Sequence, residues 1–182
     1  MKPRNIRNLY QQLGVQAYYQ QYGEQYQNPH WEQIKALLVQ NEPQLDYTQV
    51  LDFCAGGGEV SWVLRELGYT GMVGSDPYLQ ALYLKNLGLP CQDWSFETVV
   101  KKGITGYYSC IISSFALHLC PADQLSTLTL QLFQATKTLV VLTPHKRPAL
   151  EIYDGVELLY SDYSLTEKGK KVFLKAYRYC YF

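Results

Sequence analysis

The stretch QVLDFCAGGGEVSWVLREL, residues 49–67, decides the fold. It begins with an apolar run at 50–54 and reaches three consecutive glycines, Gly56, Gly57 and Gly58. Apolar residues then recur at the spacing of an amphipathic helix. A strand, a tight glycine turn and a helix in this order open a nucleotide-binding α/β unit, because glycines accept positive φ and let a ligand approach the backbone. The free N–H groups of the new helix would face that ligand.

Two other nucleotide sites share parts of this pattern. A phosphate-binding P-loop is excluded, because no Gly-Lys-Ser/Thr triplet follows the glycines. A nicotinamide site would have a third glycine where this chain has Ser61, although an acid about 20 residues further on fits both sites. Asp52, at the carboxyl end of the strand, favours a ligand with an ammonium group. An NAD-dependent oxidoreductase therefore remains as the weaker alternative.

The segment DFCAGGG at 52–58 resembles motif I of the class I S-adenosylmethionine-dependent methyltransferases, in which an acid is followed by glycines at every second position. Cys54 stands where that family usually has its first glycine. The segment GSDP at 74–77 resembles the end of the family's second strand. The resemblance implies that Asp76 holds the ribose hydroxyls of the cofactor.

Two later segments extend this resemblance. QDW at 92–94 is similar to the third-strand motif, whose acid contacts the adenine amino group, although Asp93 could instead cap the helix that follows. SSFALHL at 113–119 resembles the loop after the fourth strand, beside the methyl donor. The resemblance thus implies S-adenosylmethionine as the cofactor and S-adenosylhomocysteine as the product. The cofactor-binding residues it implies are Asp52, Cys54, Gly56, Gly58, Asp76, Pro77, Asp93, Trp94 and Ser114.

The acceptor side offers two histidines. His118 follows the fourth strand, and an imidazole there could transfer a proton near the reacting centre or simply cap the loop. The segment TPHKRP at 143–148 follows the fifth strand on the same rim of the sheet. Its His145 and the basic pair after it could engage an anionic substrate group, and a solvated basic loop is the alternative. The sequence SSFA stands where nucleobase amino methyltransferases have Asn/Asp-Pro-Pro-Tyr, which disfavours that substrate.

The N-terminal segment is rich in tyrosine and glutamine. Residues 1–42 are predicted to form a helical lid that contributes to the substrate pocket, with Tyr19 and Tyr26 as substrate-binding candidates. An amphipathic helix that merely covers one face of the sheet is an equally good interpretation. A helix to about residue 40 is predicted to open at Asn28–Pro29, with Asn28 as its N-cap, and a later helix is predicted to start at Pro77. The methyltransferase domain itself is expected at 43–182, within one structural domain.

Strands and helices alternate along the rest of the chain. The predicted fold is α/β, with a three-layer, Rossmann-like, mostly parallel seven-stranded sheet, helices on both faces and a C-terminal antiparallel strand pair. The strands are expected at 50–54, 72–76, 89–91, 107–113, 138–143, 156–160 and 171–181. Between the last two lies a polar connection, SDYSLTEKGK.

Composition limits the classes of partner and the location that we expect for the protein. The chain has 182 residues, with 16 Lys and Arg against 16 Asp and Glu, so no overall field recruits nucleic acid or an acidic membrane. The five cysteines form no C-x-x-C pair and are expected to be reduced, and no metal ligand set is visible. There is no membrane-length apolar run and no signal-peptide core, which predicts a cytoplasmic protein.

The sequence therefore predicts an enzyme that transfers a methyl group from S-adenosylmethionine. A small-molecule acceptor is favoured, and a protein or RNA acceptor stays open. A catalytically silent cofactor-binding protein that activates or scaffolds a partner is the first alternative. The NAD-dependent oxidoreductase is the second.

Overall fold

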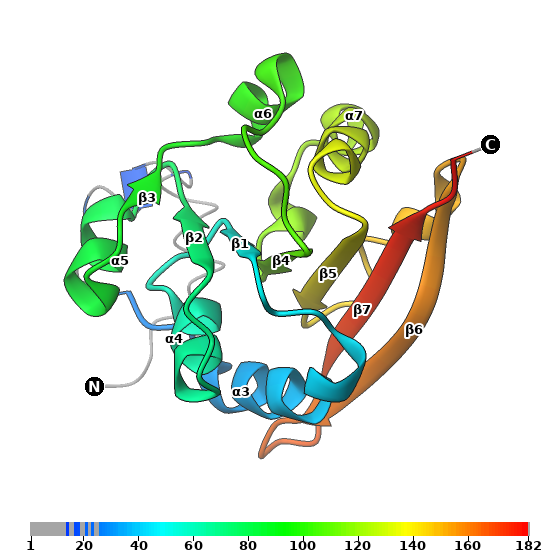
Figure 1. The fold of residues 1–182 in the computed structure, drawn as a ribbon. Coiled ribbons are helices and arrows are strands. Elements are labelled where there is room, and N and C mark those ends of the chain that lie inside the picture. The colour runs from blue at the N-terminus through cyan, green and yellow to red at the C-terminus, as the bar shows by residue number, and fades with distance from the viewer. Residues whose placement is uncertain (1–13, 15–16, 19–20, 22, 24–25, 182) are drawn as a thin grey trace.

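The computed structural model describes residues 14, 17–18, 21, 23 and 26–181; Tyr19 lies outside this set. In the described residues, a seven-stranded sheet has the order β3-β2-β1-β4-β5-β7-β6 (Figure 1). Its strands are β1 Val50–Phe53, β2 Met72–Ser75, β3 Cys91–Gln92, β4 Cys110–Ser114, β5 Thr138–Thr143, β6 Val156–Leu165 and β7 Lys171–Tyr179. The first five are parallel, while β7 runs antiparallel to both β5 and β6. The predicted fold class is confirmed.

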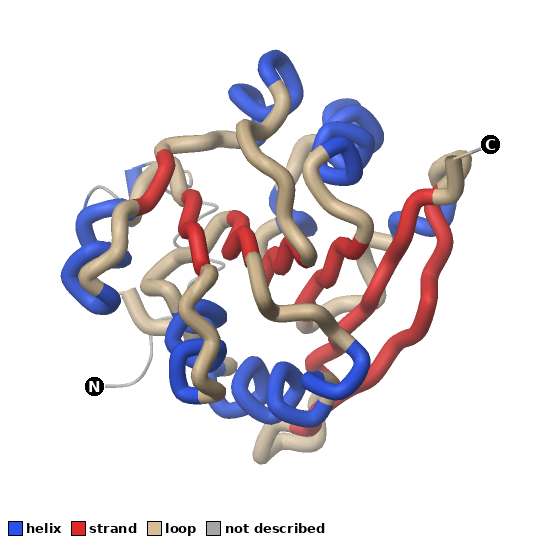
Figure 2. The backbone as a smooth tube through the Cα atoms, in the orientation of Figure 1, coloured by secondary structure: helices blue, strands red, loops and turns tan. Residues whose placement is uncertain are grey.

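Helices cover both faces of this sheet (Figures 1 and 2). From residue 26 to residue 181, the α-helices are α3 Trp31–Gln40, α4 Glu59–Glu66, α5 Gln80–Leu87, α6 Phe96–Lys102 and α7 Ala122–Gln134. The 3-10 turns are η2 Glu42–Gln44, η3 Leu117–Leu119 and η4 Leu150–Ile152. Buried residues of α3 and α4 pack with one face of the central strands, and those of α6 and α7 with the other.

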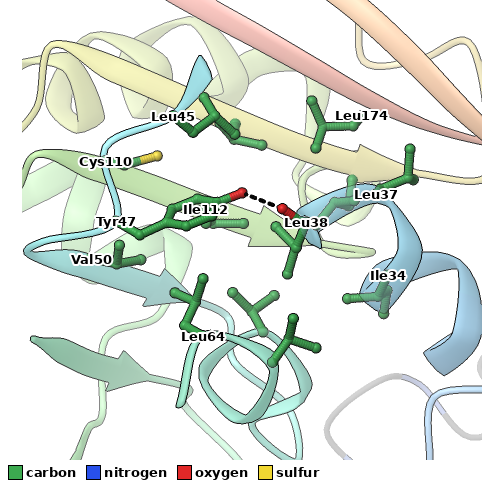
Figure 3. Packing of buried hydrophobic residues seen from close by; sticks show 14 of the residues in the cluster. Ile34, Leu37, Leu38, Leu45, Tyr47, Val50, Leu64, Cys110, Ile112 and Leu174 are labelled. Carbon is green, nitrogen blue, oxygen red and sulfur yellow. Dashed lines mark hydrogen bonds between the residues drawn. The ribbon is translucent and has the colours of Figure 1, made fainter. Parts of the chain in front are cut away.

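The core under α3 and α4 includes a buried tyrosine. Tyr47 is only 1% exposed, and its hydroxyl donates a hydrogen bond of 3.1 Å to the carbonyl of Leu38 (Figure 3). A buried phenol needs such a partner, since an unpaired hydroxyl in an apolar environment costs free energy. This bond joins the end of α3 to the segment that leads into β1, so the helix is fixed relative to the strand that carries the glycine turn.

Two glycines allow α4, α5 and the sheet to approach closely. A Cβ added at Gly74 in β2 would overlap the ring of Tyr83, and one at Gly58 would overlap Leu87. Gly58 also has a φ of 88° and caps α4, so both its conformation and its packing require glycine. The glycine turn is therefore part of the packing of the first β/α unit as well as a candidate ligand site.

The helix boundaries differ from the predicted ones at two proline-containing starts. α3 begins at Trp31 rather than at Asn28, because the Asn28 Oδ1 atom accepts from the backbone N–H of His30 at 2.9 Å and makes a separate turn. α5 begins at Gln80 and not at Pro77, since the Asp76 carboxylate accepts from the N–H groups of the residues that follow Pro77.

Several strands also differ from their predicted limits. β4 begins at Cys110 rather than at residue 107, and β1 and β7 end one and two residues early. β3 lies at Cys91–Gln92, later than predicted, because the proline at 90 has no N–H to give to a sheet. β6 continues through the first half of the segment taken for a polar connection. Its residues are polar because β6 is an edge strand with many exposed side chains, and its pairing with β7 supplies the backbone hydrogen bonds.

Candidate functional site

A cavity of about 340 Å³ opens at the carboxyl ends of β1, β2 and β4. Ligands of open α/β sheets bind at this edge. The cavity is lined by Tyr26, Cys54, Gly56, Asp76, Pro77, Tyr78, Ser95, Phe96, Glu97, Ser114, Phe115, Ala116, Leu119, Pro121 and Gln124. Of the residues predicted to bind the cofactor or the substrate, it brings together Tyr26, Cys54, Gly56, Asp76, Pro77 and Ser114.

Asp76 follows β2 and is one of two acidic residues in this lining, the other being Glu97. Its Oδ2 atom accepts from the backbone N–H of Gly56 at 3.0 Å, and Oδ1 accepts from those of Tyr78 and Leu79 at 2.8 and 2.9 Å. Burial raises the pKa of this carboxyl, and the three N–H groups oppose that shift. Since a carboxylate oxygen has more than one acceptor site, Oδ2 can still accept from a ligand hydroxyl in the cavity.

Asp52 is fully buried and does not line the cavity. Its Oδ2 atom accepts from the backbone N–H and the hydroxyl of Ser61 at 3.1 and 2.7 Å, and that hydroxyl lies 2.8 Å from the hydroxyl of Tyr83. Burial raises the pKa of Asp52 to about 8. Its Oδ1 atom has no hydrogen-bond partner within the described part of the chain. Asp52 therefore fixes the start of α4, and its contact with an ammonium group stays a prediction.

Two residues other than glycine have positive φ at this edge. Cys54 follows β1 with a φ of 59°, and Phe115 follows β4 with a φ of 55°. A left-handed conformation costs a residue with a Cβ on the order of 1 kcal/mol, which explains why glycine suits the position of Cys54. Burial raises the pKa of the Cys54 thiol well above its ordinary value. The thiol is therefore protonated at neutral pH and is no nucleophile.

Tyr26 lies against the glycine turn. A Cβ added at Gly56 would come within 3.1 Å of its Cε1 atom. Tyr26 also borders a second cavity, of about 370 Å³, on the far side of the turn. That cavity is lined by Gly58, Trp31 and Trp62, among others. Gly58, which was predicted to bind the cofactor, thus lines the second cavity and not the first.

Asp93 and Trp94 lie outside both cavities. Asp93 is exposed, and it does not cap α6 as the alternative interpretation had it. The cap is Ser95, whose Oγ atom accepts from the backbone N–H of Thr98 at 3.1 Å. Trp94 packs against the core below α6 and α7. Contact of Asp93 or Trp94 with adenine stays a prediction.

His118 and His145 face one another, with ring centroids 5.5 Å apart and an edge-on geometry. His118 lies in η3 between two lining residues, Ala116 and Leu119, but is not itself part of the lining. Burial, followed by the charge of His145, lowers the pKa of His118 to about 4. Its Nδ1 atom has no hydrogen-bond partner among the described residues. The His118 imidazole is therefore uncharged at neutral pH.

Several residues that line the 340 Å³ cavity were not predicted from the sequence. Phe96 and Glu97 line the cavity from the start of α6, and the Ser-x-x-Thr spacing of the cap at Ser95 could have located that start. Phe115 stacks on His30, with centroids 4.9 Å apart and an interplanar angle of 11°. Nothing in the sequence links residues 85 positions apart that meet only in the folded chain.

Solved structures with the same arrangement identify the fold. One is an S-adenosylmethionine-dependent methyltransferase from Anabaena variabilis, with a TM-score of 0.68, 11% identity, and coverage of 97% of this chain and 96% of that one. The chain has the class I methyltransferase fold. Two more methyltransferases agree. NodS of Bradyrhizobium japonicum, an N-methyltransferase in complex with S-adenosylhomocysteine, has a TM-score of 0.67 and 9% sequence identity. The match covers 96% of this chain and 98% of that one. The magnesium protoporphyrin IX methyltransferase of Synechocystis with bound S-adenosylmethionine has a TM-score of 0.63 and 17% sequence identity, and the match covers 95% of each chain.

At the level of sequence, this methyltransferase-fold chain is 29% identical to an uncharacterized protein of Schizosaccharomyces pombe over 195 residues, 82% of this chain and 78% of that protein. No family model matches the sequence. No helix among the described residues is both long and apolar enough to cross a membrane. Nor do three or more His, Cys, Asp or Glu side chains gather into a metal site in the described ranges.

Proposed function

We propose that this chain transfers a methyl group from S-adenosylmethionine to a small-molecule acceptor. The observation that carries the proposal is the 340 Å³ cavity beside the glycine turn, in a fold shared with methyltransferases crystallised with that cofactor or its product. A cavity of this size lies in the range of small-molecule sites. One structural neighbour is by name a magnesium protoporphyrin IX methyltransferase, which acts on a small molecule, and this supports the same class of acceptor here.

The lining residues fit the cofactor. Asp76 has acceptor capacity left at Oδ2 for the ribose hydroxyls. The Ser114 Oγ atom is buried in the lining without a hydrogen-bond partner in the described residues, and a polar ligand would satisfy it. Gly56 has a φ of 59° and leaves its backbone accessible. We assign the ribose to Asp76 and the region of the methyl donor to Ser114.

Bound S-adenosylmethionine would supply an electrophilic methyl group on a sulfonium. The task of the protein is then to hold the acceptor's nucleophile in line with that methyl group and to exclude water. Phe115 and Leu119 supply apolar surface at this end of the cavity. The His118 imidazole lies just outside this lining, and with a pKa lowered to about 4 it is a weak base; we therefore assign it a role in positioning the loop after β4 rather than in removing a proton.

The first test is calorimetric titration with S-adenosylmethionine, S-adenosylhomocysteine and NAD. We expect the first two to bind in the micromolar range and NAD not to bind. Asp76→Asn should weaken binding of both about ten-fold or more, because a charge-assisted hydrogen bond to a ribose hydroxyl is lost. Asp154→Asn, an exposed substitution in the turn before β6, is the matched control. Full affinity in the Asp76→Asn protein would refute the ribose assignment, and no binding to the wild type would refute the cofactor.

A labelled-methyl screen of metabolite, protein and RNA fractions separates the enzyme from a silent cofactor-binding protein. We expect label to appear in the metabolite fraction. Binding of S-adenosylmethionine without label in any fraction would favour the silent protein instead.

A further inference from the structure

We propose that the methyl acceptor carries a carboxylate or phosphate group and that two basic loops beside the cavity bind it. This rests on the proposed methyl transfer. The first loop, residues 144–148, follows β5 and carries His145, Lys146 and Arg147. The second, residues 166–171, is the tip of the β6–β7 hairpin and the first residue of β7. Together the two loops are called the basic rim below.

The charge of the basic rim stands out against the balance of the chain. Its two loops contain five Lys or Arg and a single acid, Glu167, whereas the whole chain has 16 basic and 16 acidic residues. The five cations are Lys146, Arg147, Lys168, Lys170 and Lys171, and all are exposed. Positive charge on one edge of a neutral protein attracts anions to that edge.

The first loop is held in place, unlike an ordinary solvated loop. The Thr143 hydroxyl donates to the carbonyl of Arg147 at 3.0 Å and accepts from the N–H of His145 at 3.2 Å. From β7, the ammonium of Lys175 donates to the carbonyls of Lys146 and Pro148. Lys175 is only 8% exposed, and burying an ammonium is costly. The buried lysine therefore fixes the loop in one geometry, as a binding site requires.

The second loop reaches the same edge of the sheet. Thr143 at the end of β5 is paired with Phe173 in β7, and Phe173 lies beside the half-exposed ring of Tyr163, with centroids 6.5 Å apart. The ammonium of Lys171 lies 4.0 Å from the centroid of the Tyr163 ring. An exposed aromatic ring and a cation thus stand two strands and one strand, respectively, from the end of β5 that carries the first loop. This pair suits a ligand with both an apolar part and a negative charge.

Both loops connect to the cavity through histidines. His145 of the first loop faces His118, whose neighbours Ala116 and Leu119 line the cavity. Near the second loop, Gln33 of α3 donates to the carbonyl of Leu165 at 3.4 Å, and His30 before α3 stacks on the lining residue Phe115. Burial lowers the pKa of His30; a hydrogen bond with Gln33 opposes this shift, and the positive charge of Lys170 adds to it, which indicates that the second loop lies near this histidine.

The test is a titration of the full-length protein, followed by NMR of the backbone amides, with three probes of similar size: benzoate, phenyl phosphate and uncharged benzamide. We expect saturable shifts at residues 145–147 and 166–171 with one or both anions and none with benzamide. Benzoate and phenyl phosphate distinguish a carboxylate from a phosphate preference. K146Q/R147Q should bind the preferred anion about ten-fold more weakly, because bidentate, charge-assisted bonds are lost.

The matched control is K85Q/K137Q, which removes the same charge from two exposed lysines outside the rim. An equal loss of anion affinity in both double variants, or equal responses to benzoate and benzamide, would overturn the inference. Titration of the same samples with S-adenosylmethionine keeps the two proposals apart. Anion binding at the rim without cofactor binding would refute methyl transfer alone, and cofactor binding without a specific anion response would refute the rim alone.

Discussion

At the scale of single residues, the site depends on groups kept in unusual states by burial. Asp52 holds Ser61 and, through it, Tyr83, yet its carboxyl is wholly removed from water. Sequence reasoning identified Asp52 as an acid at the end of a strand and expected it to face a ligand. It could not show that the side chain turns towards α4, because that depends on where the Ser61 hydroxyl lies after the helix has packed.

The pH dependence of stability should report on Asp52. Its pKa is about 8 in the folded chain and about 4 in an unfolded one, so the folded state holds the extra proton between these values. Its contribution to stability is complete below about pH 4 and is lost as the pH rises through about 8. We expect the unfolding free energy of Asp52→Asn to fall less steeply over this range, by up to about 1.4 kcal/mol per pH unit.

Urea unfolding at several pH values measures this difference. Asp154→Asn serves as the control, because that side chain is exposed. Parallel pH profiles for the wild type and Asp52→Asn would contradict a protonated carboxyl at this position.

A second residue-scale prediction concerns the backbone at Cys54. With a φ of 59°, this position favours glycine over any residue with a Cβ. Cys54→Gly should therefore be more stable than Cys54→Ala by about 1 kcal/mol, although glycine is usually the less stabilising of the two. Chemical denaturation of the two variants gives the comparison directly, and a more stable alanine variant would argue against the left-handed conformation.

At the scale of elements, the start of α6 forms one wall of the cavity. Ser95 caps the helix, and Phe96 and Glu97 follow it into the lining. The helix itself was predictable from its pattern, but the alternative interpretation of Asp93 as its cap was wrong, since the cap is Ser95, two positions later. Both Asp and Ser are good capping residues, and the local sequence does not distinguish them.

Ser95→Ala should destabilise the protein by about 1 kcal/mol, because the N–H of Thr98 loses its acceptor. The conservative variant Ser95→Asp keeps an acceptor at the cap and should regain most of that stability. Thermal unfolding of both variants tests the assignment. If the two variants lose stability equally, the hydrogen bond at the cap contributes little and the wall is held by packing alone.

At the scale of the whole molecule, the fold class was the most predictable feature: a mostly parallel seven-stranded sheet with a C-terminal antiparallel pair. Alternation of apolar strands with amphipathic helices indicated the parallel part. Two strand-like stretches around a polar connection, together with the resemblance to the methyltransferases, indicated the antiparallel pair. The contacts between distant segments were not predictable. Phe115 on His30 and Lys175 under the loop after β5 depend on the register of strands and on side-chain directions. Neither the register of the strands nor the direction of these side chains can be inferred from the local sequence.

The position of Tyr26 has a consequence for how tightly any ligand can bind. Its ring borders both the 340 Å³ and the 370 Å³ cavity and lies against Gly56. A molecule that extended from one cavity to the other would bind only to chains in which the Tyr26 ring has moved away from this position. Its measured dissociation constant is then the intrinsic constant divided by the fraction of chains in which the ring has already moved. For such a ligand, part of the binding free energy would be used to displace the Tyr26 ring, and the measured affinity would be lower by that amount.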